Sequence, residues 1–328
     1  MKKVVVIGGG TGTYTVLSGL KKFDLDLTAI VTVSDSGGST GKLRDEFGNL
    51  PVGDSRMALV ALAETDEDNE VLRKLFLYRF DKGDGLRGHN FGNLFLVALT
   101  EIFGSQEKAM KYASNVLRVK GKVLPISNDA AELVAQFDGG DLIVGETRID
   151  EPNGKHDGKK RIRKLWLQPK AKIAPEAKKA ILEADLIVLG PGDLYTSVLA
   201  NVVVEGVALA LQKTKAKIVF NVNLIAKYGQ TFGFAASDHV SEIARYAGRA
   251  PDFVLINHKP LPKRILKKYV SEKGYPVKDD LMGKTKFKLI RADLLGAEEI
   301  KKPSGDVLVR SLIRHDSDKL AREMMKLI

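Results

Sequence analysis

The chain contains no cysteine among its 328 residues. That absence excludes disulfide bonds, thiolate zinc sites and cysteine nucleophiles, and it fits a reducing compartment. No apolar run reaches membrane-spanning length, so we expect no membrane span. Only the four apolar residues Val4 to Ile7 separate Lys2 and Lys3 from the first glycines, which is too few for the core of a secretory leader. We therefore expect a globular protein of the cytoplasm.

Positive charge, in contrast, is in excess, since 52 basic residues outnumber 41 acidic ones and give a formal net charge of +11. This excess favours anionic partners, but the charge is diffuse along the chain, and we prefer the interpretation of a lysine-rich solvated surface. One dense basic cluster, Lys159 to Lys164, has Trp166 as its only aromatic neighbour. Because nucleic-acid strands bind on stacked aromatic side chains, we predict a solvated turn there and no specific nucleic-acid site.

Strand-like and helix-like segments alternate along the chain. Several of the strand-like segments are continuously apolar, which indicates a parallel sheet covered by helices on both faces. We predict one α/β unit over residues 1–328, with a doubly wound, mostly parallel, Rossmann-like sheet. The predicted strands are Val4–Ile7, Leu27–Val33, Val116–Val123, Leu142–Arg148, Ile162–Leu167, Leu186–Leu189, Ile218–Val222, Phe253–Asn257 and Lys286–Ala292. The predicted helices are Met57–Glu64, Leu94–Phe103, Pro175–Glu183, Val198–Gln212, Asp238–Tyr246 and Asp316–Ile328.

One segment departs from this alternation. Asn153-Gly154 and Asp157-Gly158 lie between two strand-like stretches, and both dipeptides are typical of tight hairpin turns. We therefore predict an antiparallel hairpin over about residues 141–168, as an excursion from the main sheet.

The first apolar strand runs into "GGGTG", a turn that exposes bare backbone at Gly8, Gly9, Gly10 and Gly12. A glycine-rich turn between a first strand and a helix is how doubly wound proteins bind phosphate. The dinucleotide fingerprint itself is broken, because its third glycine is Thr13 or Thr15, depending on where the motif begins. The sequence therefore predicts an anion site and disfavours a dehydrogenase.

Further loops of this kind carry glycines and polar residues to predicted strand ends and helix starts, where N–H groups favour anions. "SNDAAEL" is the weakest, because alone it indicates only a helix N-cap at Asn128 and Asp129. Together the loops predict a nucleotide-type crevice at the carboxyl ends of the parallel strands. The candidate binding residues are Gly8, Gly9, Gly10, Thr11, Gly12, Asp35, Gly37, Gly38, Ser39, His89, Asn90, Asn93, Asn128, Asp129, Gly190, Gly192, Asp193, Tyr195, Thr196, Asn221 and Asn223.

In combination these motifs resemble the YvcK/CofD-like family, which contains gluconeogenesis factors and 2-phospho-L-lactate transferases. The resemblance runs from "GGGTG" through "SDSGGSTGKLR", "RGHNFGNL" and "ADLIVLGPGDLYTS" to "RHDSDKLAREMMKLI". Thr13-Tyr14-Thr15 differs from the Thr-Pro-Lys usual in the transferases, so the chain is more similar to the YvcK branch. The resemblance implies a regulatory protein that binds a UDP-sugar such as UDP-N-acetylglucosamine and influences carbon metabolism and cell-wall morphogenesis.

The same resemblance implies positions for the ligand. It puts Gly190, Gly192, Asp193, Tyr195 and Thr196 beside the nucleotide and Gly8 to Gly12 beside phosphate. No cofactor is required in this interpretation, and a protein partner would receive the regulatory signal. A homo-oligomer is expected only because most soluble proteins form one.

The alternative is a transferase that moves a phospholactyl group to a deazaflavin acceptor. Such an enzyme would need Mg²⁺ against phosphate, and Asp35, Asp54 and His89 are the available candidates. None of them shows a spacing that identifies a catalytic group or a metal site. Departures from the YvcK pattern at Val52, Ser55, Asp193 and Phe232 leave the identity of the sugar open.

Overall fold

The structure is a computed structural model, and it describes residues 1–48, 51–152, 156–283, 285–296 and 312–328. Its main sheet has seven strands in the order β12-β10-β8-β7-β1-β2-β3, and all neighbouring pairs are parallel. The strands are β1 (Lys2–Gly8), β2 (Leu25–Val31), β3 (Lys122–Pro125), β7 (Leu186–Leu189), β8 (Lys217–Asn221), β10 (Phe253–Asn257) and β12 (Lys288–Ala292).

Helices cover both faces of this sheet, as the continuous apolar strands predict. Along β1, Val4 and Val6 belong to one buried core, and Val5 and Ile7 belong to another. The first core includes residues of α1 (Gly10–Leu20), α3 (Gly53–Leu62), α4 (Glu67–Leu77), α5 (Phe91–Phe103), α6 (Gln106–Val116) and α13 (Ser317–Met325). The second includes residues of α8 (Pro175–Glu183), the π-helical η1 (Leu194–Leu199), α9 (Ala200–Val202), α10 (Val207–Lys213) and α11 (Ala236–Ala247). The doubly wound, Rossmann-like fold is confirmed.

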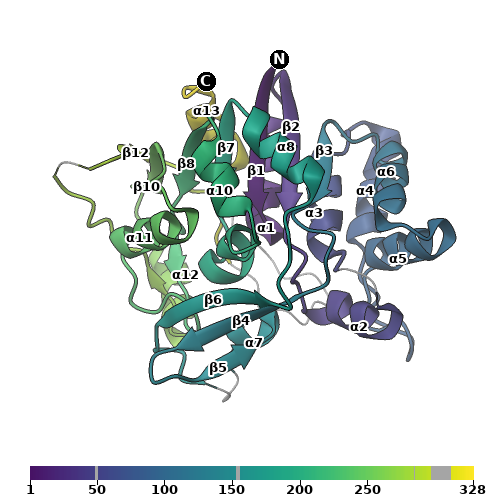
Figure 1. The fold of residues 1–328 in the computed structure, drawn as a ribbon, viewed down its shortest axis with the longest axis horizontal. Helices are drawn as coiled ribbons and strands as arrows, with labels where there is room; N and C mark the ends of the chain where they lie inside the picture. Colours follow the sequence, from purple (N-terminus) through teal and green to yellow (C-terminus); the bar gives the residue numbers. More distant parts are fainter. Residues whose placement is uncertain (49–50, 153–155, 284, 297–311) are drawn as a thin grey trace.

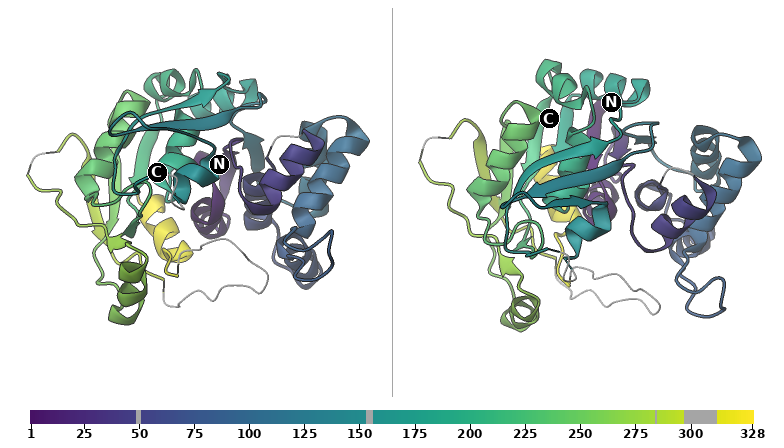
Figure 2. Two further views of the ribbon diagram at one scale, coloured as in Figure 1. Left: turned by 90° about the horizontal axis from the view of Figure 1, so that it is seen from below. Right: turned by 60° about the horizontal axis from the view of Figure 1, so that its bottom comes forward.

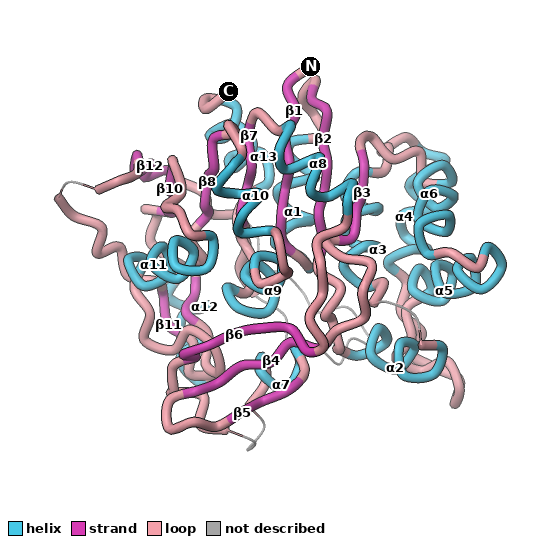
Figure 3. Tube along the Cα trace, viewed as in Figure 1, coloured by secondary structure: helices cyan, strands magenta, loops and turns pink. Residues whose placement is uncertain are grey.

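Several elements lie at the edges of the main sheet. Figure 3 shows α4, α5 and α6 grouped beside β3, and α11 and α12 (Lys263–Ser271) toward the opposite edge of the sheet. The helix α2 (Gly38–Phe47) contacts α5. A short two-stranded sheet joins β9 (Ile225–Ala226) to β11 (Tyr275–Pro276). Among the described residues, no helix is long and apolar enough to cross a membrane.

The excursion is a three-stranded antiparallel sheet in the order β5-β4-β6 rather than a simple hairpin. Its strands are β4 (Glu132–Phe137), β5 (Leu142–Val144) and β6 (Ile162–Gln168), and the short helix α7 (Glu146–Asp150) follows β5. Figures 1 and 2 show it below the carboxyl ends of the parallel strands, in front of them when the lower side is turned forward. Asp157-Gly158 does begin a turn, with Lys160 N–H bonded to Asp157 O at 2.9 Å. Asn153-Gly154 lies outside the described residues.

Four local predictions are wrong. No helix begins at Asn128 and Asp129, because strand β4 follows them and pairs with β5 and β6. The strand expected from Val116 begins only at Lys122, since α6 continues to Val116. The strand expected over 142–148 ends at Val144, where Gly145 at φ 98° starts α7. The helix expected over 198–212 is interrupted before α10 at Gly206, whose φ is 96°.

Candidate functional site

The glycine loops after β1 and β7 meet where the strand order reverses. From β1 the chain proceeds outward through β2 and β3, and it returns to the other side of β1 as β7. A Cβ atom at Gly12 would lie only 1.9 Å from the Pro191 carbonyl oxygen, so the two loops touch main chain to main chain. Such a reversal point is where doubly wound proteins bind their ligands. The structure therefore brings the predicted loops Gly8–Gly12 and Gly190–Gly192 together.

Asp54, in the first turn of α3, lies against the opening turn. Its Oδ1 accepts a hydrogen bond from Gly10 N–H at 2.7 Å, and a Cβ at Gly9 would meet its Oδ2 at 2.2 Å. Gly10 itself has φ 59°, a conformation that side chains disfavour. Burial and the charge of Asp35 raise the pKa of Asp54 to about 7. The protein's own carboxylate thus occupies one donor at the start of α1.

Other carboxylates gather around Asp54. Asp35 Oδ1 accepts from Gly37 N–H at 2.8 Å in the loop after β2. The helix α7 reaches this loop through Thr147 N–H, which donates to Ser36 Oγ at 3.1 Å, and α7 also carries Glu146. Burial and the charge of Asp35 raise the pKa of Glu146 well above its ordinary range. A crowded set of acids therefore lies beside the glycine loops.

Lys227 is the cation of this cluster. Its Nζ lies 2.5 Å from Asp150 Oδ1 in α7 and 3.2 Å from Asp193 Oδ2 in the loop after β7. Burial lowers the pKa of Lys227, but the two carboxylates outweigh burial and the net direction is upward. Burial raises the pKa of Asp150 to about 6 even with Lys227 beside it. The ammonium thus ties α7 to the loop after β7.

Gln230 reinforces this tie. Its amide nitrogen donates to Asp150 Oδ1 and, at 3.0 Å, to Thr196 Oγ1, while its oxygen accepts from Tyr195 N–H at 3.2 Å. Thr196 is buried and already bonded, and Tyr195 points into the core, where its hydroxyl donates to Glu242 at 3.0 Å. Both predicted residues therefore position the loop after β7 in this structure.

Three asparagines hydrogen-bond the main-chain carbonyls of the glycine loops. Asn201, Asn221 and Asn223 donate their amide N–H groups to the carbonyls of Gly8, Gly190 and Gly192 at 3.2, 3.1 and 2.7 Å. Their Oδ1 atoms are buried and have no hydrogen-bond partner among the described residues. A buried acceptor without a donor costs free energy. Asn201 and Asn221 are fully buried, so Asn223, which is half-buried, is the one of the three whose oxygen a ligand N–H or O–H could stabilise.

Ser39, His89, Asn90 and Asn93 form a buried network next to these acids. Ser39 Oγ accepts from Asn90 N–H at 3.2 Å and from Asn93 Nδ2 at 3.3 Å, and it lies 3.4 Å from His89 Nδ1. Asn93 Oδ1 accepts from Arg56 Nε at 2.8 Å. These contacts join α2, α3 and α5. The predicted Gly38 starts α2 with φ 48°.

Asn128 and Asp129 are exposed after β3, where Asp129 Oδ2 accepts from Lys172 N–H at 2.8 Å. That contact joins them to the segment before α8 and to none of the glycine loops. Within the described ranges, no group of three or more histidines and carboxylates is arranged to hold a metal ion.

Sequence reasoning missed Glu146, Asp150, Lys227 and Gln230 as members of the site. Lys227 and Gln230 lie in "NVNLIAKYGQTFG", next to the predicted Asn223. The sequence therefore points to this segment, but it does not show which carboxylates pair with Lys227. Glu146 and Asp150 had no signal of their own, because they reach the crevice only through the way α7 folds back against Ser36 and Lys227.

Fold and crevice together define a doubly wound, Rossmann-like α/β protein with glycine loops converging at the reversal point of its sheet. The family described as 2-phospho-L-lactate transferase CofD matches residues 4–295. The chain belongs to this CofD/YvcK family, in the branch of the gluconeogenesis factors.

Two curated relatives and one solved structure match it over nearly their whole length. A putative gluconeogenesis factor of Thermotoga maritima is 43% identical over 320 residues, covering 97% of each chain. A gluconeogenesis factor of Bacillus subtilis is 38% identical over 331 residues, covering 99% of this chain and 98% of its own. A crystal structure of a Bacillus halodurans protein has a TM-score of 0.87 at 37% identity, with 99% of both chains covered.

Proposed function

We propose that the crevice between the two glycine loops binds a nucleotide sugar such as UDP-N-acetylglucosamine, and that the chain is a regulatory protein of carbon metabolism and cell-wall morphogenesis. The observation that carries the proposal is the close contact between Gly12 and Pro191. A ligand lying over that contact meets main-chain groups, as pyrophosphates do in doubly wound proteins. The relatives' name, gluconeogenesis factor, supports a role in carbon metabolism. We propose further that it acts in the cytoplasm, as a homo-oligomer with a regulatory protein partner.

The charges of the crevice support a ligand that brings both phosphate and hydrogen-bond donors. Lys227 supplies a cation beside the loop after β7, and Asn223 Oδ1 supplies a free acceptor. Carboxylates repel phosphate, but the raised pKa values of Asp54 (about 7) and Asp150 (about 6) leave part of each population neutral near neutral pH. The hydroxyl groups of the sugar and the N–H groups of the base could donate to the Asn223 oxygen, which has no donor of its own.

One observation favours the second candidate, the phospholactyl transferase. Asp35 and Asp54 are close enough for the charge of the first to raise the pKa of the second. Mg²⁺ is commonly bound by one or two carboxylates together with substrate phosphates, so these two residues fit that mode. Such an ion would neutralise charge on the transferred phosphate. His89 is already placed against Ser39 and is the weaker candidate.

The test is a calorimetric titration of the protein with UDP-N-acetylglucosamine, UDP, GDP and NAD, with and without Mg²⁺. We expect the UDP-sugar to bind, and Asn223→Ala to weaken its binding by at least about 0.5 to 1.5 kcal/mol, because the variant lacks the acceptor for the ligand and also the bond that holds the Gly192 carbonyl. Asn115→Ala, at an exposed position of α6, is the matched control. Binding of NAD or GDP in preference to the UDP-sugar contradicts the proposal.

Turnover separates regulator from enzyme. We expect no product when guanosine-linked phospholactate and a deazaflavin alcohol are incubated with the protein and Mg²⁺. Multiple turnovers that depend on Mg²⁺ and disappear in Asp35→Asn would establish the transferase instead.

A further inference from the structure

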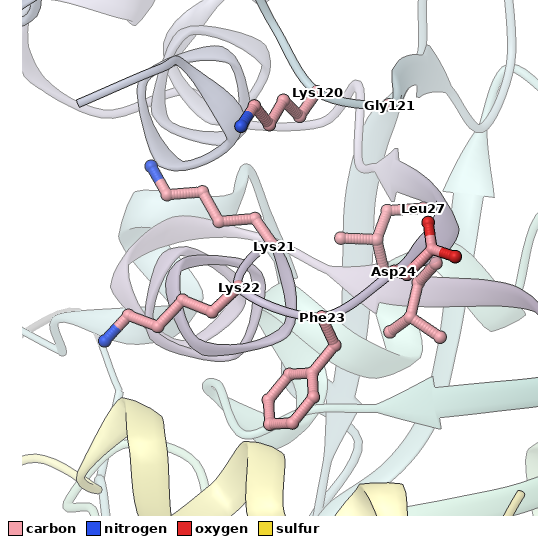
Figure 4. Close-up of a pocket in the computed structure, with 8 residues that line it drawn as sticks. Lys21, Lys22, Phe23, Asp24, Leu27, Lys120 and Gly121 are labelled. Atoms are coloured by element: carbon pink, nitrogen blue, oxygen red, sulfur yellow. The ribbon is translucent and has the colours of Figure 1, made fainter. Parts of the chain in front are cut away.

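A cavity lies at the amino ends of β2 and β3, whereas the glycine loops follow the carboxyl ends of β1 and β7. Figure 4 shows the residues that line it. It has a volume of about 450 Å³ and is formed where α1 turns into β2 and where the chain enters β3. Its lining residues are Lys21, Lys22, Phe23, Asp24, Leu25, Leu27, Lys120 and Gly121. None of them belongs to the site described above.

Two ammonium groups converge at this cavity. Figure 4 shows Lys21 and Lys120 extending to the same side from separate segments, while Lys22 points away and pairs with Asp318 at 2.5 Å. Among the described residues Lys21 makes no ion pair, and its Nζ donates to the neutral Ala63 carbonyl at 2.6 Å.

The surroundings of Lys21 leave its positive charge poorly compensated. Burial is the largest cause that lowers the pKa of Lys21, and the positive charges of Arg73, Lys120 and Lys22 lower it further, to about 8. The opposing acid is Glu70, which is already bonded to Arg73 at 2.8 Å. Among the described residues Lys120 has one acid partner, Glu64, at 3.8 Å, which also pairs with Arg118. An incoming anion would therefore meet the unpaired ammonium of Lys21 and the weakly paired one of Lys120, which together outnumber the one carboxylate in the lining, Asp24.

We propose that this amino-end cavity is a binding site for a small phosphate monoester, held between Lys21 and Lys120. Two ammonium groups match the double negative charge of a phosphate monoester and can each donate several hydrogen bonds to its oxygens. Phe23, Leu25 and Leu27 supply an apolar wall for the organic part of such a metabolite. The two lysine charges exceed the partial negative charge of about one half at the end of α1.

The site has a direct mechanical connection to the glycine crevice. Lys21 is the C-cap residue of α1, and Gly10 at the other end of the same helix contacts Asp54. The 11 residues of α1 span about 16 Å at 1.5 Å per residue. A ligand at the amino-end cavity therefore acts on the rigid element that begins at the glycine turn, which suits an effector site.

The experiment is a calorimetric titration with glycerol 2-phosphate and with inorganic phosphate at constant ionic strength, on the wild type, Lys21→Gln and Lys120→Gln. The matched control is Lys179→Gln, because Lys179 is similarly exposed and similarly distant from an acid, 3.9 Å from Glu183. We expect each cavity variant to weaken binding about tenfold or more, as removal of a charged partner does, and the control to bind like the wild type. Binding near pH 8 should also draw protons onto the wild type and not onto Lys21→Gln.

Lys21 also caps the end of α3 through Ala63, so Lys21→Gln can lose stability for a structural reason. Lys120→Gln leaves that bond in place, so its phosphate affinity tests the site without this structural effect. Phosphate binding that survives in Lys120→Gln lies elsewhere, at the glycine loops for example, and overturns the proposal. Absence of binding to the wild type, or an equal loss in Lys179→Gln, overturns it as well.

Discussion

At the residue scale, Gly12 is the glycine with least room for a side chain among those that the structure describes. Its added Cβ would lie 1.9 Å from Pro191 O, and this neighbour is main chain that cannot rotate away. We expect Gly12→Val to destabilise the fold by about 1 to 3 kcal/mol or to abolish binding in the crevice. Urea unfolding and ligand titration measure the two effects. Gly85→Val is the control, since a Cβ there meets nothing within 4 Å. Unchanged stability together with unchanged binding would falsify the assignment.

Asp54 gives a prediction about pH. Its pKa of about 7 in the folded protein exceeds the ordinary 3.8, so the folded state keeps a proton that the unfolded chain releases. Its contribution to stability is therefore largest below pH 4 and is lost as the pH rises from 4 to 7. Asp54→Asn cannot ionise and keeps an acceptor for Gly10 N–H. We expect its melting temperature relative to wild type to increase between pH 5 and pH 8, by the equivalent of about 1 to 3 kcal/mol.

The control for this series is Asp81→Asn, at an exposed position. A difference between Asp54→Asn and wild type that stays flat from pH 5 to pH 8 would show that Asp54 ionises normally. Parallel behaviour of Asp81→Asn would assign the pH effect to the surface as a whole.

Features of single residues could be predicted where their cause is local. The glycines at 8–12 and 190–192 predict that another group approaches the main chain closely, and the structure places these two turns in contact. The partners of Lys227 were not predictable, because Asp150 and Asp193 are 77 and 34 residues away from it in sequence.

At the scale of elements, Lys227 joins α7 to the loop after β7 through ion pairs with Asp150 and Asp193. Removing the ammonium leaves Asp150 and Asp193 facing each other without a cation. We expect Lys227→Met to cost about 1 to 3 kcal/mol at pH 8 and clearly less at pH 5, where Asp150 takes up a proton. Chemical denaturation at the two pH values measures this difference.

Asp150→Asn combined with Lys227→Met should recover part of the lost stability at pH 8, since one of the stranded carboxylates is then neutral. Lys217→Met is the control, because Lys217 also pairs with a carboxylate, Asp252 at 3.5 Å, away from the crevice. An equal cost at pH 5 and pH 8 would mean that Lys227 contributes by packing alone.

Elements of the parallel sheet could be predicted because each is a short apolar run buried on both faces, as Leu186–Leu189 and Phe253–Asn257 were. Strand β4 could not, because "SNDAAEL" has the local chemistry of a helix start. Pairing with β5 and β6 on both sides overrides that preference. The interrupted helix after η1 was hidden for a similar reason, since only Gly206 marks the break.

At the scale of the whole molecule, the antiparallel sheet shares its core with the parallel one. Leu133, Leu165 and Leu167 belong to the same buried cluster as Ile187 and Leu189. We therefore expect one cooperative unfolding transition, in agreement with the prediction of a single unit over 1–328. Trp166, the only tryptophan, lies in β6, so its fluorescence reports on the antiparallel sheet while circular dichroism reports on the whole chain. Transitions at different urea concentrations would mean that the antiparallel sheet unfolds separately.

The seven-stranded sheet is open, so its outer strands have backbone groups on which another chain could add a strand. Both edges are poor templates for such growth. The strand β3 is four residues long and ends at Pro125, which has no N–H to donate, and β12 carries the exposed charges of Lys288 and Arg291. Any association between copies of this chain should therefore use helices and loops rather than strand addition at the edges of the sheet.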